Sequence, residues 1–279
     1  MHWRHVLLMC VLIFFWLWSL PLLLLAAVAC VPAAWFMLVG SVSLSLVLQW
    51  CHHDRIVPRH FVRRWLARIP WHQWFPCTPL HFQGPAVVSV HPHGLLCCGA
   101  VAGIHLVPES TSVLAVAPIL FYVPVIGWML RVIGCIPAEL SVMREALQRG
   151  CVLLVVPGGV PEIVLAESGD DCRRFPRHGF LRLARSPEVP LWCVFVRGEC
   201  SLFSMIRGPC LDWRAWFSWR FNVPFVMPIF LGWYGTWLPK RKPLKLSRKR
   251  CDVLTKEGYG ETLRQLVYLT RTTMDKCHE

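Results

Sequence analysis

The sequence has little charge, and almost no acidic charge near its start. Only 16% of its 279 residues are charged while 55% are hydrophobic, and the first acidic residue is Asp54. This is too little charge to cover the surface of an ordinary soluble protein. The composition therefore predicts association with membrane lipids. The formal net charge of +13 includes a basic run at residues 240–250. No recognisable nucleic-acid-binding module accompanies it, so we expect a lipid surface and not nucleic acid as the partner.

Motifs of several common protein classes are also missing. GxSxG, the P-loop and GxGxxG do not occur, which removes the commonest serine hydrolases and nucleotide-binding proteins. The 14 cysteines include no CxxC pair and are scattered through apolar runs. We therefore interpret them as small buried hydrophobic residues in a reducing compartment, and not as a disulfide scaffold.

A long apolar stretch precedes the first acidic residue. Residues 6–50 are nearly uncharged, with Pro32 where a reversal would fall. Each half has about the ~20 residues that a helix needs to cross a bilayer. The alternative is a cleaved signal peptide, with Arg4 as its basic start and Ala27-Val28-Ala29 as its cleavage site. We expect a transmembrane helical hairpin over residues 1–52, with both ends cytosolic because basic residues flank it.

Two further regions follow the expected hairpin. Residues 53–84 mix Arg with Trp and Phe and are expected to lie along the membrane interface. Residues 85–279 alternate short β-rich runs with helix-compatible stretches, which predicts an α/β fold, an αβα domain around a mostly parallel sheet. The expected strands are Ala86–Val90, Val113–Ala117, Val152–Val156 and Leu191–Val196.

The first expected strand runs into two histidines and a glycine, His91-Pro92-His93-Gly94. Functional groups of parallel sheets gather beyond the carboxyl ends of strands. Imidazole has an ordinary pKa of ~6.5, so it can accept a hydroxyl proton near neutral pH. The alternatives are two structural histidines in a turn, or two zinc ligands. A third zinc ligand at a useful spacing is not apparent, so no metal is expected.

Two later segments carry further candidate residues. The third expected strand ends in a turn with Gly158 and Gly159 and then presents Glu162. Backbone amides of such a turn can face an oxyanion, and the carboxylate can orient a histidine. Arg177 and Arg182 form a basic strip that suits the phosphates of coenzyme A. A plain turn and a solvated helix face are the alternatives.

These three segments, in this order behind an apolar stretch, resemble the diacylglycerol acyltransferase type-2 family over residues 85–240. HPHG is the most specific element. Residues 158–162, GGVPE, are similar to the GGAxE block of that family, and residues 177–184, RHGFLRLA, are similar to its RxGFxxxA block. The stretch that normally ends in FGE ends here in Arg197-Gly198-Glu199.

The resemblance implies transfer of a fatty acyl group from acyl-CoA to the hydroxyl of a mono- or diacylglycerol, at the endoplasmic reticulum or a lipid droplet. Acyl-CoA is then a substrate, and no cofactor is implied. The catalytic histidine is placed at His93, with Glu162 as its partner and His91 in a structural or acceptor-positioning role. The residues expected to contact substrate are Gly94, Gly158, Gly159, Arg177, Gly179, Arg182 and Glu199.

The sequence also departs from the family pattern. Cys193 replaces a proline, Arg197 replaces a phenylalanine, Ser247–Cys251 replace a Gly-x-Pro-Ile element, and no histidine accompanies Tyr259 near the C-terminus. Two alternatives therefore stay open: a membrane acyl hydrolase or thioesterase that uses the same histidine, and an inactive lipid-binding scaffold. The motifs indicate neither an acyl-length preference nor an oligomeric state, although an oligomer is possible.

Overall fold

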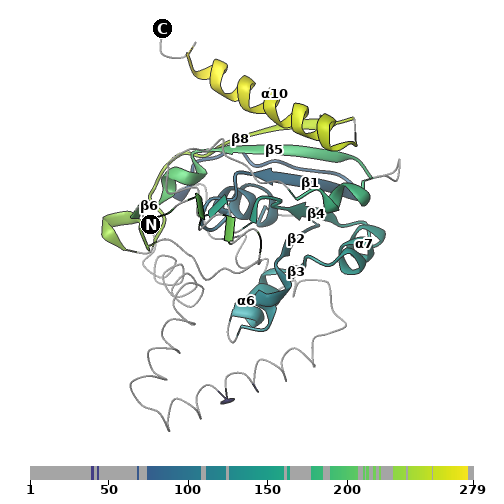
Figure 1. Cartoon of the computed structure of the whole chain (residues 1–279), viewed down its shortest axis with the longest axis horizontal. Coiled ribbons are helices and arrows are strands. Elements are labelled where there is room, and N and C mark those ends of the chain that lie inside the picture. Colours follow the sequence, from purple (N-terminus) through teal and green to yellow (C-terminus); the bar gives the residue numbers. More distant parts are fainter. Residues whose placement is uncertain are drawn as a thin grey trace.

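The computed structural model describes most of the region from Trp74 onward. It covers residues 74–107, 111–123, 126–159, 162–163, 177–184, 189–206, 229–236, 238–252 and 254–275, with isolated residues 39, 40, 43, 68, 210, 212, 213, 216, 217 and 220. A six-stranded sheet in the order β3-β2-β4-β1-β5-β8 forms its centre (Figure 1). The strands are β1 (Ala86–His91), β2 (Ser112–Val116), β3 (Cys135–Pro137), β4 (Val152–Val155), β5 (Leu191–Arg197) and β8 (Lys245–Cys251).

Five of these strands run parallel, and the edge strand β8 runs antiparallel to β5. The predicted mostly parallel sheet is confirmed. All four predicted strands are present, with bounds that differ by no more than one residue at either end. β3 and β8 were not predicted, and neither was the small antiparallel pair β6 (Ser204–Ile206) and β7 (Ile229–Leu231).

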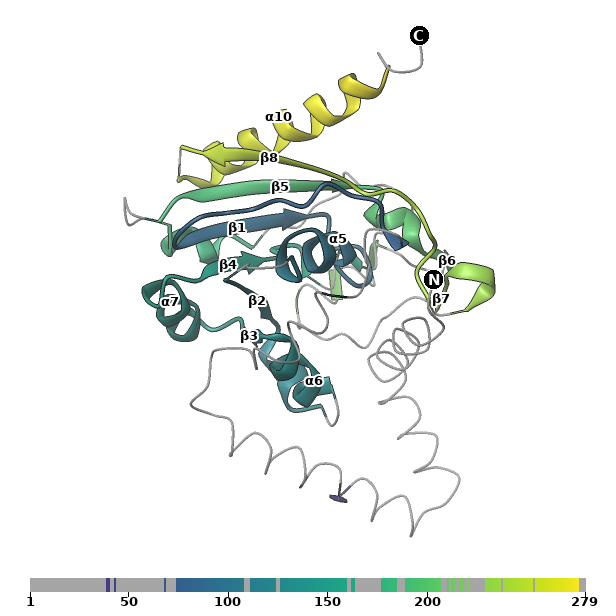
Figure 2. The same cartoon turned by 180° about the vertical axis from the view of Figure 1, so that it is seen from behind.

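The sheet is covered on both faces, so its central strands are apolar on both sides, as parallel strands usually are. Val88 and Val90 of β1 point into one core, which also takes in apolar residues of α5 (Cys98–Ala100), the π-helical turn η1 (Val101–His105) and α6 (Ile126–Ile133). Val87 points into the opposite core, with α7 (Leu140–Gln148), the 3₁₀ turn η4 (Gly179–Arg182) and α10 (Lys256–Asp275). Figure 2 shows α5 in front of the sheet, as part of the first layer. Three more 3₁₀ turns are η2 (Pro118–Phe121), η5 (Glu199–Leu202) and η7 (Trp233–Gly235).

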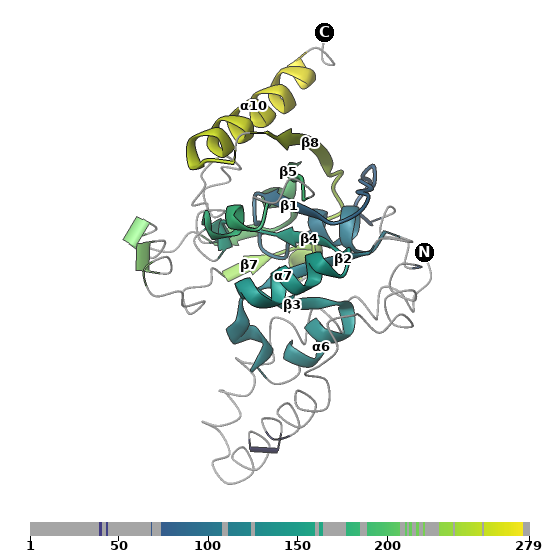
Figure 3. The same cartoon turned by 90° about the vertical axis from the view of Figure 1, so that its right-hand side faces the viewer.

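The terminal helix α10 packs across β5 and β8 (Figures 1 and 3). Tyr259, Leu263, Leu266 and Val267 are buried, and their spacing places them on one face of the helix. Charged residues occupy the other face. This amphipathic pattern brings one aromatic residue of α10, Tyr259, into the core close to β1.

The expected transmembrane hairpin is corrected by this structure. Among the described residues, no helix is long and apolar enough to cross a membrane. In the described region, apolar side chains are buried in two cores on opposite faces of one sheet. Residues 6–50 lie almost entirely outside the described residues. The αβα part of the predicted fold stands, and the division into 1–52, 53–84 and 85–279 stays a prediction.

Candidate active site

The two sequence segments singled out after β1 and β4 meet at one edge of the sheet. β1 and β4 are neighbours in parallel register, with Ser89 opposite Val155. Their carboxyl ends therefore point the same way, and the HPHG segment lies beside the turn that contains Gly158. This adjacency is what the parallel topology requires.

Glu162 lies between the two histidines and is 3% exposed. Its Oε2 accepts a hydrogen bond from the backbone N–H of His93 at 2.8 Å, and its Oε1 lies 3.4 Å from Nδ1 of His91. The carboxylate predicted to hold the imidazole of His93 therefore holds its backbone, and the imidazole that it faces is that of His91. A Cβ at Gly158 would lie 1.7 Å from Cδ of Glu162, so glycine at this position makes room for the carboxylate.

His91 is fully buried and has a polar group on each side of its ring. Its Nε2 lies 2.6 Å from Oη of Tyr259, which in turn lies 3.1 Å from Oγ of Ser89. The rings of His178 and Phe180 pack edge-on against Tyr259. We call Glu162, His91, Tyr259 and Ser89 the buried polar chain. It runs from the HPHG segment to the terminal helix.

His93 is half-buried and differs from His91 in its contacts. Its Nδ1 lies 2.9 Å from the backbone oxygen of Gly94. A carbonyl oxygen only accepts, so Nδ1 carries the proton and Nε2 presents its lone pair. Cys97 Sγ lies 3.4 Å from Nδ1 and 3.7 Å from Nε2. This tautomer leaves Nε2 able to accept a proton from a substrate hydroxyl.

The charges of the site suit a neutral histidine above an ionised carboxylate. Burial lowers the pKa of His93, opposed in part by its contact with Gly94 and by the charge of Glu162. Burial raises the pKa of Glu162, but the nearby His91 and the hydrogen bond from the N–H of His93 lower it by more. The pKa of Glu162 is therefore below its ordinary value. At neutral pH the site therefore holds an uncharged His93 imidazole and a Glu162 carboxylate.

Glu199 binds the backbone just after the HPHG turn. It is buried, and its two oxygens accept hydrogen bonds from the backbone N–H groups of Cys98 at 2.7 Å and Gly99 at 2.8 Å. Gly94 has a φ of +56°, and a Cβ there would lie 2.4 Å from Cγ of Glu199. Both predicted residues thus shape the turn that carries His93, and their contact with substrate stays a prediction.

The predicted basic strip lies at the surface near the glycine turn. The side chains of Arg177 and Arg182 are exposed, as is Gly179. The backbone N–H of Arg177 donates to the carbonyl of Pro157 at 3.1 Å, which ties the start of the strip to the turn after β4. Gly159 in that turn is half-buried with a φ of +57°. The structure therefore joins the strip to the site through the backbone.

Two residues of the site were not assigned a role from the sequence, Tyr259 and Ser89. A buried tyrosine needs a partner for its hydroxyl, and the apolar spacing of α10 would have placed Tyr259 in the core. That signal predicts burial but does not identify the partner. Within the described residues there is also no group of three or more His, Cys, Asp or Glu side chains placed to hold a metal ion.

Fold and site together define an αβα protein whose polar site is built on the histidine turn after a central strand. The chain belongs to the diacylglycerol acyltransferase family, whose model matches residues 28–254. It is 27% identical to human 2-acylglycerol O-acyltransferase 3 over 63% of this chain and 58% of the relative. It is 29% identical to mouse 2-acylglycerol O-acyltransferase 1 over 60% and 56%, respectively.

A fission-yeast relative extends the comparison to a second group of names. Diacylglycerol O-acyltransferase 1 of Schizosaccharomyces pombe is 24% identical over 68% of this chain and 63% of the relative. The matched part thus spans less than two thirds of the length of these relatives. Among solved structures, the 1-acyl-sn-glycerophosphate acyltransferase PlsC of Thermotoga maritima aligns with a TM-score of 0.42 and 14% identity, over 83% of this chain and 97% of that one.

Proposed function

We propose that this protein transfers a fatty acyl group from acyl-CoA to the hydroxyl of a mono- or diacylglycerol, with His93 as the general base. The observation that carries the proposal is the state of His93. Its Nδ1 is engaged by the carbonyl of Gly94, its Nε2 is left as the acceptor, and burial lowers its pKa. A general base must be unprotonated and must present a lone pair to the hydroxyl, and these features supply both. The names of the relatives support the substrate class.

In the proposed reaction, Nε2 of His93 removes the proton from the acceptor hydroxyl while its oxygen attacks the thioester carbonyl carbon. The tetrahedral intermediate places negative charge on the former carbonyl oxygen. We assign this oxyanion to backbone N–H groups of Gly94 or of Gly158 and Gly159, the glycines of the two turns that meet at the site. The carbon–sulfur bond then breaks, and the coenzyme A thiolate takes the proton from the imidazolium. The products are the ester and free coenzyme A.

The carboxylate of Glu162 assists this step through its negative charge. An imidazolium forms transiently at His93, and a nearby ionised carboxylate stabilises it. Because Glu162 accepts from the backbone N–H of His93, it also fixes where the ring stands. His91 touches no solvent, so we assign it a positioning role and not contact with substrate.

Arg177 and Arg182 supply positive charge near the site for the phosphates of coenzyme A. The acceptor and the acyl chain are lipids, so the reaction belongs at a lipid surface. We place it at the endoplasmic reticulum membrane or a lipid droplet, where acylglycerols accumulate. The net charge of +13 suits an anionic membrane face.

The test is labelled acyl-CoA offered with a panel of mono- and diacylglycerols to membranes that contain the protein. We expect labelled glycerides from the wild type, and a loss of turnover on the order of 10²–10⁴-fold in His93→Ala. His81→Ala removes an exposed histidine and serves as the matched control. Labelled free fatty acid with no glyceride would identify a hydrolase. If the wild type forms neither labelled glyceride nor labelled free fatty acid, the protein is a lipid-binding scaffold and the proposal is wrong.

A further inference from the structure

The buried polar chain contains a proton-counting constraint. Tyr259 Oη stands between two groups that can each accept its proton, Nε2 of His91 at 2.6 Å and Oγ of Ser89 at 3.1 Å. A phenol has one proton, so it can donate to only one of them. For a neutral His91, the chain therefore has two arrangements of protons with the same heavy-atom positions.

In the first arrangement, Tyr259 donates to Nε2 of His91 and accepts from the hydroxyl of Ser89, and the proton of a neutral His91 is on Nδ1. That N–H then faces Oε1 of Glu162, 3.4 Å away. In the second arrangement, Nε2 of His91 donates to Tyr259, and Tyr259 donates to Ser89. Nδ1 of His91 then turns a lone pair toward the carboxylate. An ionised carboxylate is repelled by that lone pair, so the first arrangement is the one compatible with a charged Glu162.

We propose that Tyr259 is a positioning residue for the acyl transfer: its hydroxyl donates to His91, which keeps the N–H of His91 toward Glu162 and keeps that carboxylate charged beneath His93. This inference rests on the proposed function and extends it to the terminal helix. Tyr259 does not touch substrate. It acts through His91 and Glu162, over a chain whose side chains are all buried.

The chemistry explains why a hydroxyl is needed at this position. Without it, Nε2 of His91 loses its partner in either tautomer. The tautomer that faces the carboxylate with N–H is no longer favoured over the other. The carboxylate then loses part of the support that keeps it ionised, and the imidazolium at His93 loses part of its counter-charge. Acyl-CoA still binds, because no atom of the chain between Tyr259 and Glu162 is needed for pairing with its phosphates.

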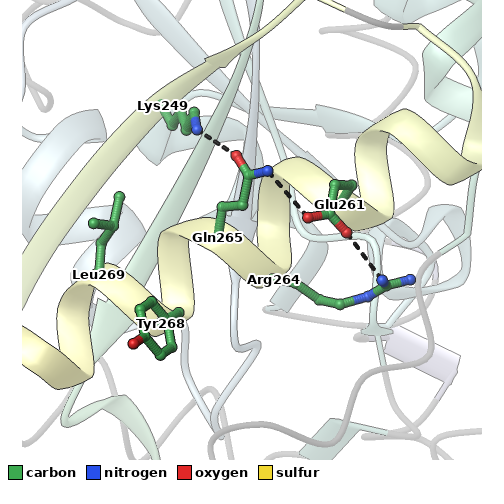
Figure 4. A pocket seen from close by; sticks show the side chains of 6 residues that line it. All are labelled: Lys249, Glu261, Arg264, Gln265, Tyr268 and Leu269. Atoms are coloured by element: carbon green, nitrogen blue, oxygen red, sulfur yellow. Dashed lines mark hydrogen bonds and ion pairs between the residues drawn. The ribbon is translucent and has the colours of Figure 1, made fainter.

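Tyr259→Phe is the informative variant, because the ring that packs against His178 and Phe180 is retained. A lost hydrogen bond in a buried site corresponds to roughly a ten- to hundredfold change in rate. We expect kcat to fall by this factor while KM for acyl-CoA stays unchanged. Tyr268→Phe is the matched control: it makes the same change on the same helix, where Tyr268 is 67% exposed (Figure 4).

The decisive measurement is a double-mutant cycle with Glu162→Gln. If Tyr259 acts by keeping the carboxylate charged, Tyr259→Phe should lower kcat by less than about threefold once that charge is absent. If Tyr259 were purely structural, Tyr259→Phe would lower kcat by the same factor in Glu162→Gln as in the wild type. Wild-type kcat in Tyr259→Phe, full multiplication in the cycle, or an equal loss in Tyr268→Phe would each overturn the inference.

The failure of the proposed function is distinguishable from the failure of this inference. If the wild type transfers no acyl group, the proposed function is wrong, whatever Tyr259 does. The same cycle can then be measured on the unfolding temperature of the full chain, which needs no turnover. Additive shifts there would show that Tyr259 and Glu162 are not linked through His91, and coupled shifts would retain the chain as a network.

Discussion

Glu162→Gln separates the charge of the site from its hydrogen bonds. The two side chains have nearly the same shape, but glutamine has one acceptor oxygen and one NH₂ group. The oxygen must face the backbone N–H of His93, because that group can only donate a hydrogen bond. The NH₂ group then faces Nδ1 of His91, which must present its lone pair. His91 can do so by placing its proton on Nε2 toward Tyr259, whose own proton passes to Ser89.

The hydrogen bond to the backbone N–H of His93 and the contact with Nδ1 of His91 can thus both be kept in Glu162→Gln. We therefore expect a small effect on folding, about 1 kcal/mol or less. The effect on catalysis is different, because the negative charge near the developing imidazolium is gone. Interactions with a charged group are worth about 1.5–3 kcal/mol, which corresponds to a loss of roughly 10- to 150-fold in kcat. The loss should stay below that of His93→Ala, since Glu162 contacts the backbone of His93 and not its ring.

The assay measures kcat at saturating acyl-CoA for Glu162→Gln and His93→Ala, together with the unfolding temperature of each variant. Glu145→Gln is the control, because Glu145 of α7 is an exposed carboxylate that pairs with Arg149 just after the helix. Two results would refute the reasoning. Equal losses in Glu162→Gln and His93→Ala would mean that the carboxylate acts on the ring directly. Unchanged turnover in Glu162→Gln would mean that its charge has no part in the reaction.

Three further outcomes are expected. Gly158→Ala should destabilise the fold by about 1–3 kcal/mol in urea unfolding, because its Cβ would overlap the buried carboxylate of Glu162, and Gly179→Ala gives a comparison with neither that overlap nor a positive φ. Replacing Arg177 and Arg182 with Gln should raise KM for acyl-CoA and leave kcat unchanged, since phosphate pairing is the same in ground and transition states; an unchanged KM would move the coenzyme A site elsewhere. Because the pKa of His93 is lowered on folding, the unfolded chain binds more protons, and stability should decrease as pH falls from about 6.5 toward the folded pKa. His93→Gln should flatten that part of the unfolding profile, and an unchanged profile would contradict the burial of a neutral ring.

The sequence predicted the sheet well, because its central strands are short apolar runs buried on both faces. In β1 and β4 every residue is buried, so each run is bounded by the polar or glycine-rich segment that follows it. The position of the candidate site followed from the same logic. Two parallel neighbours must place their carboxyl ends together, and these ends carry the histidine and glycine motifs.

The contacts inside the site could not be predicted in this way. Which imidazole Glu162 faces depends on the room left by Gly158 and on the direction of one side chain. The partner of His91 is Tyr259, 168 residues further along the chain, and no spacing rule joins them. Both contacts are consequences of packing between elements, which periodicity along the chain does not report.

The basic run at residues 240–250 shows a different limit. Because the run is so rich in charge, the strand β8 was not predicted from it. Leu246, Arg248 and Arg250 lie on one face of β8, and Lys249 and Cys251 lie on the other. Arg248 lies over the rings of Phe82 and Trp192, so part of this charge covers aromatic surface. Charged side chains on an edge strand also discourage pairing with other chains. Pairing with β5 outweighs the low β propensity of such residues.

The buried polar chain is expensive to keep in an otherwise apolar core. A buried ion pair or polar network rarely stabilises a fold more than apolar side chains of similar volume would. Ser89, His91 and Tyr259 lie among valine, leucine and phenylalanine of the core beneath α10, where those residues would pack without any need for partners. Stability therefore gives no reason for the polar residues to be there. The need to hold one carboxylate charged and one histidine in place gives such a reason. It also explains why this chain of contacts leads to Glu162, which binds the backbone of His93.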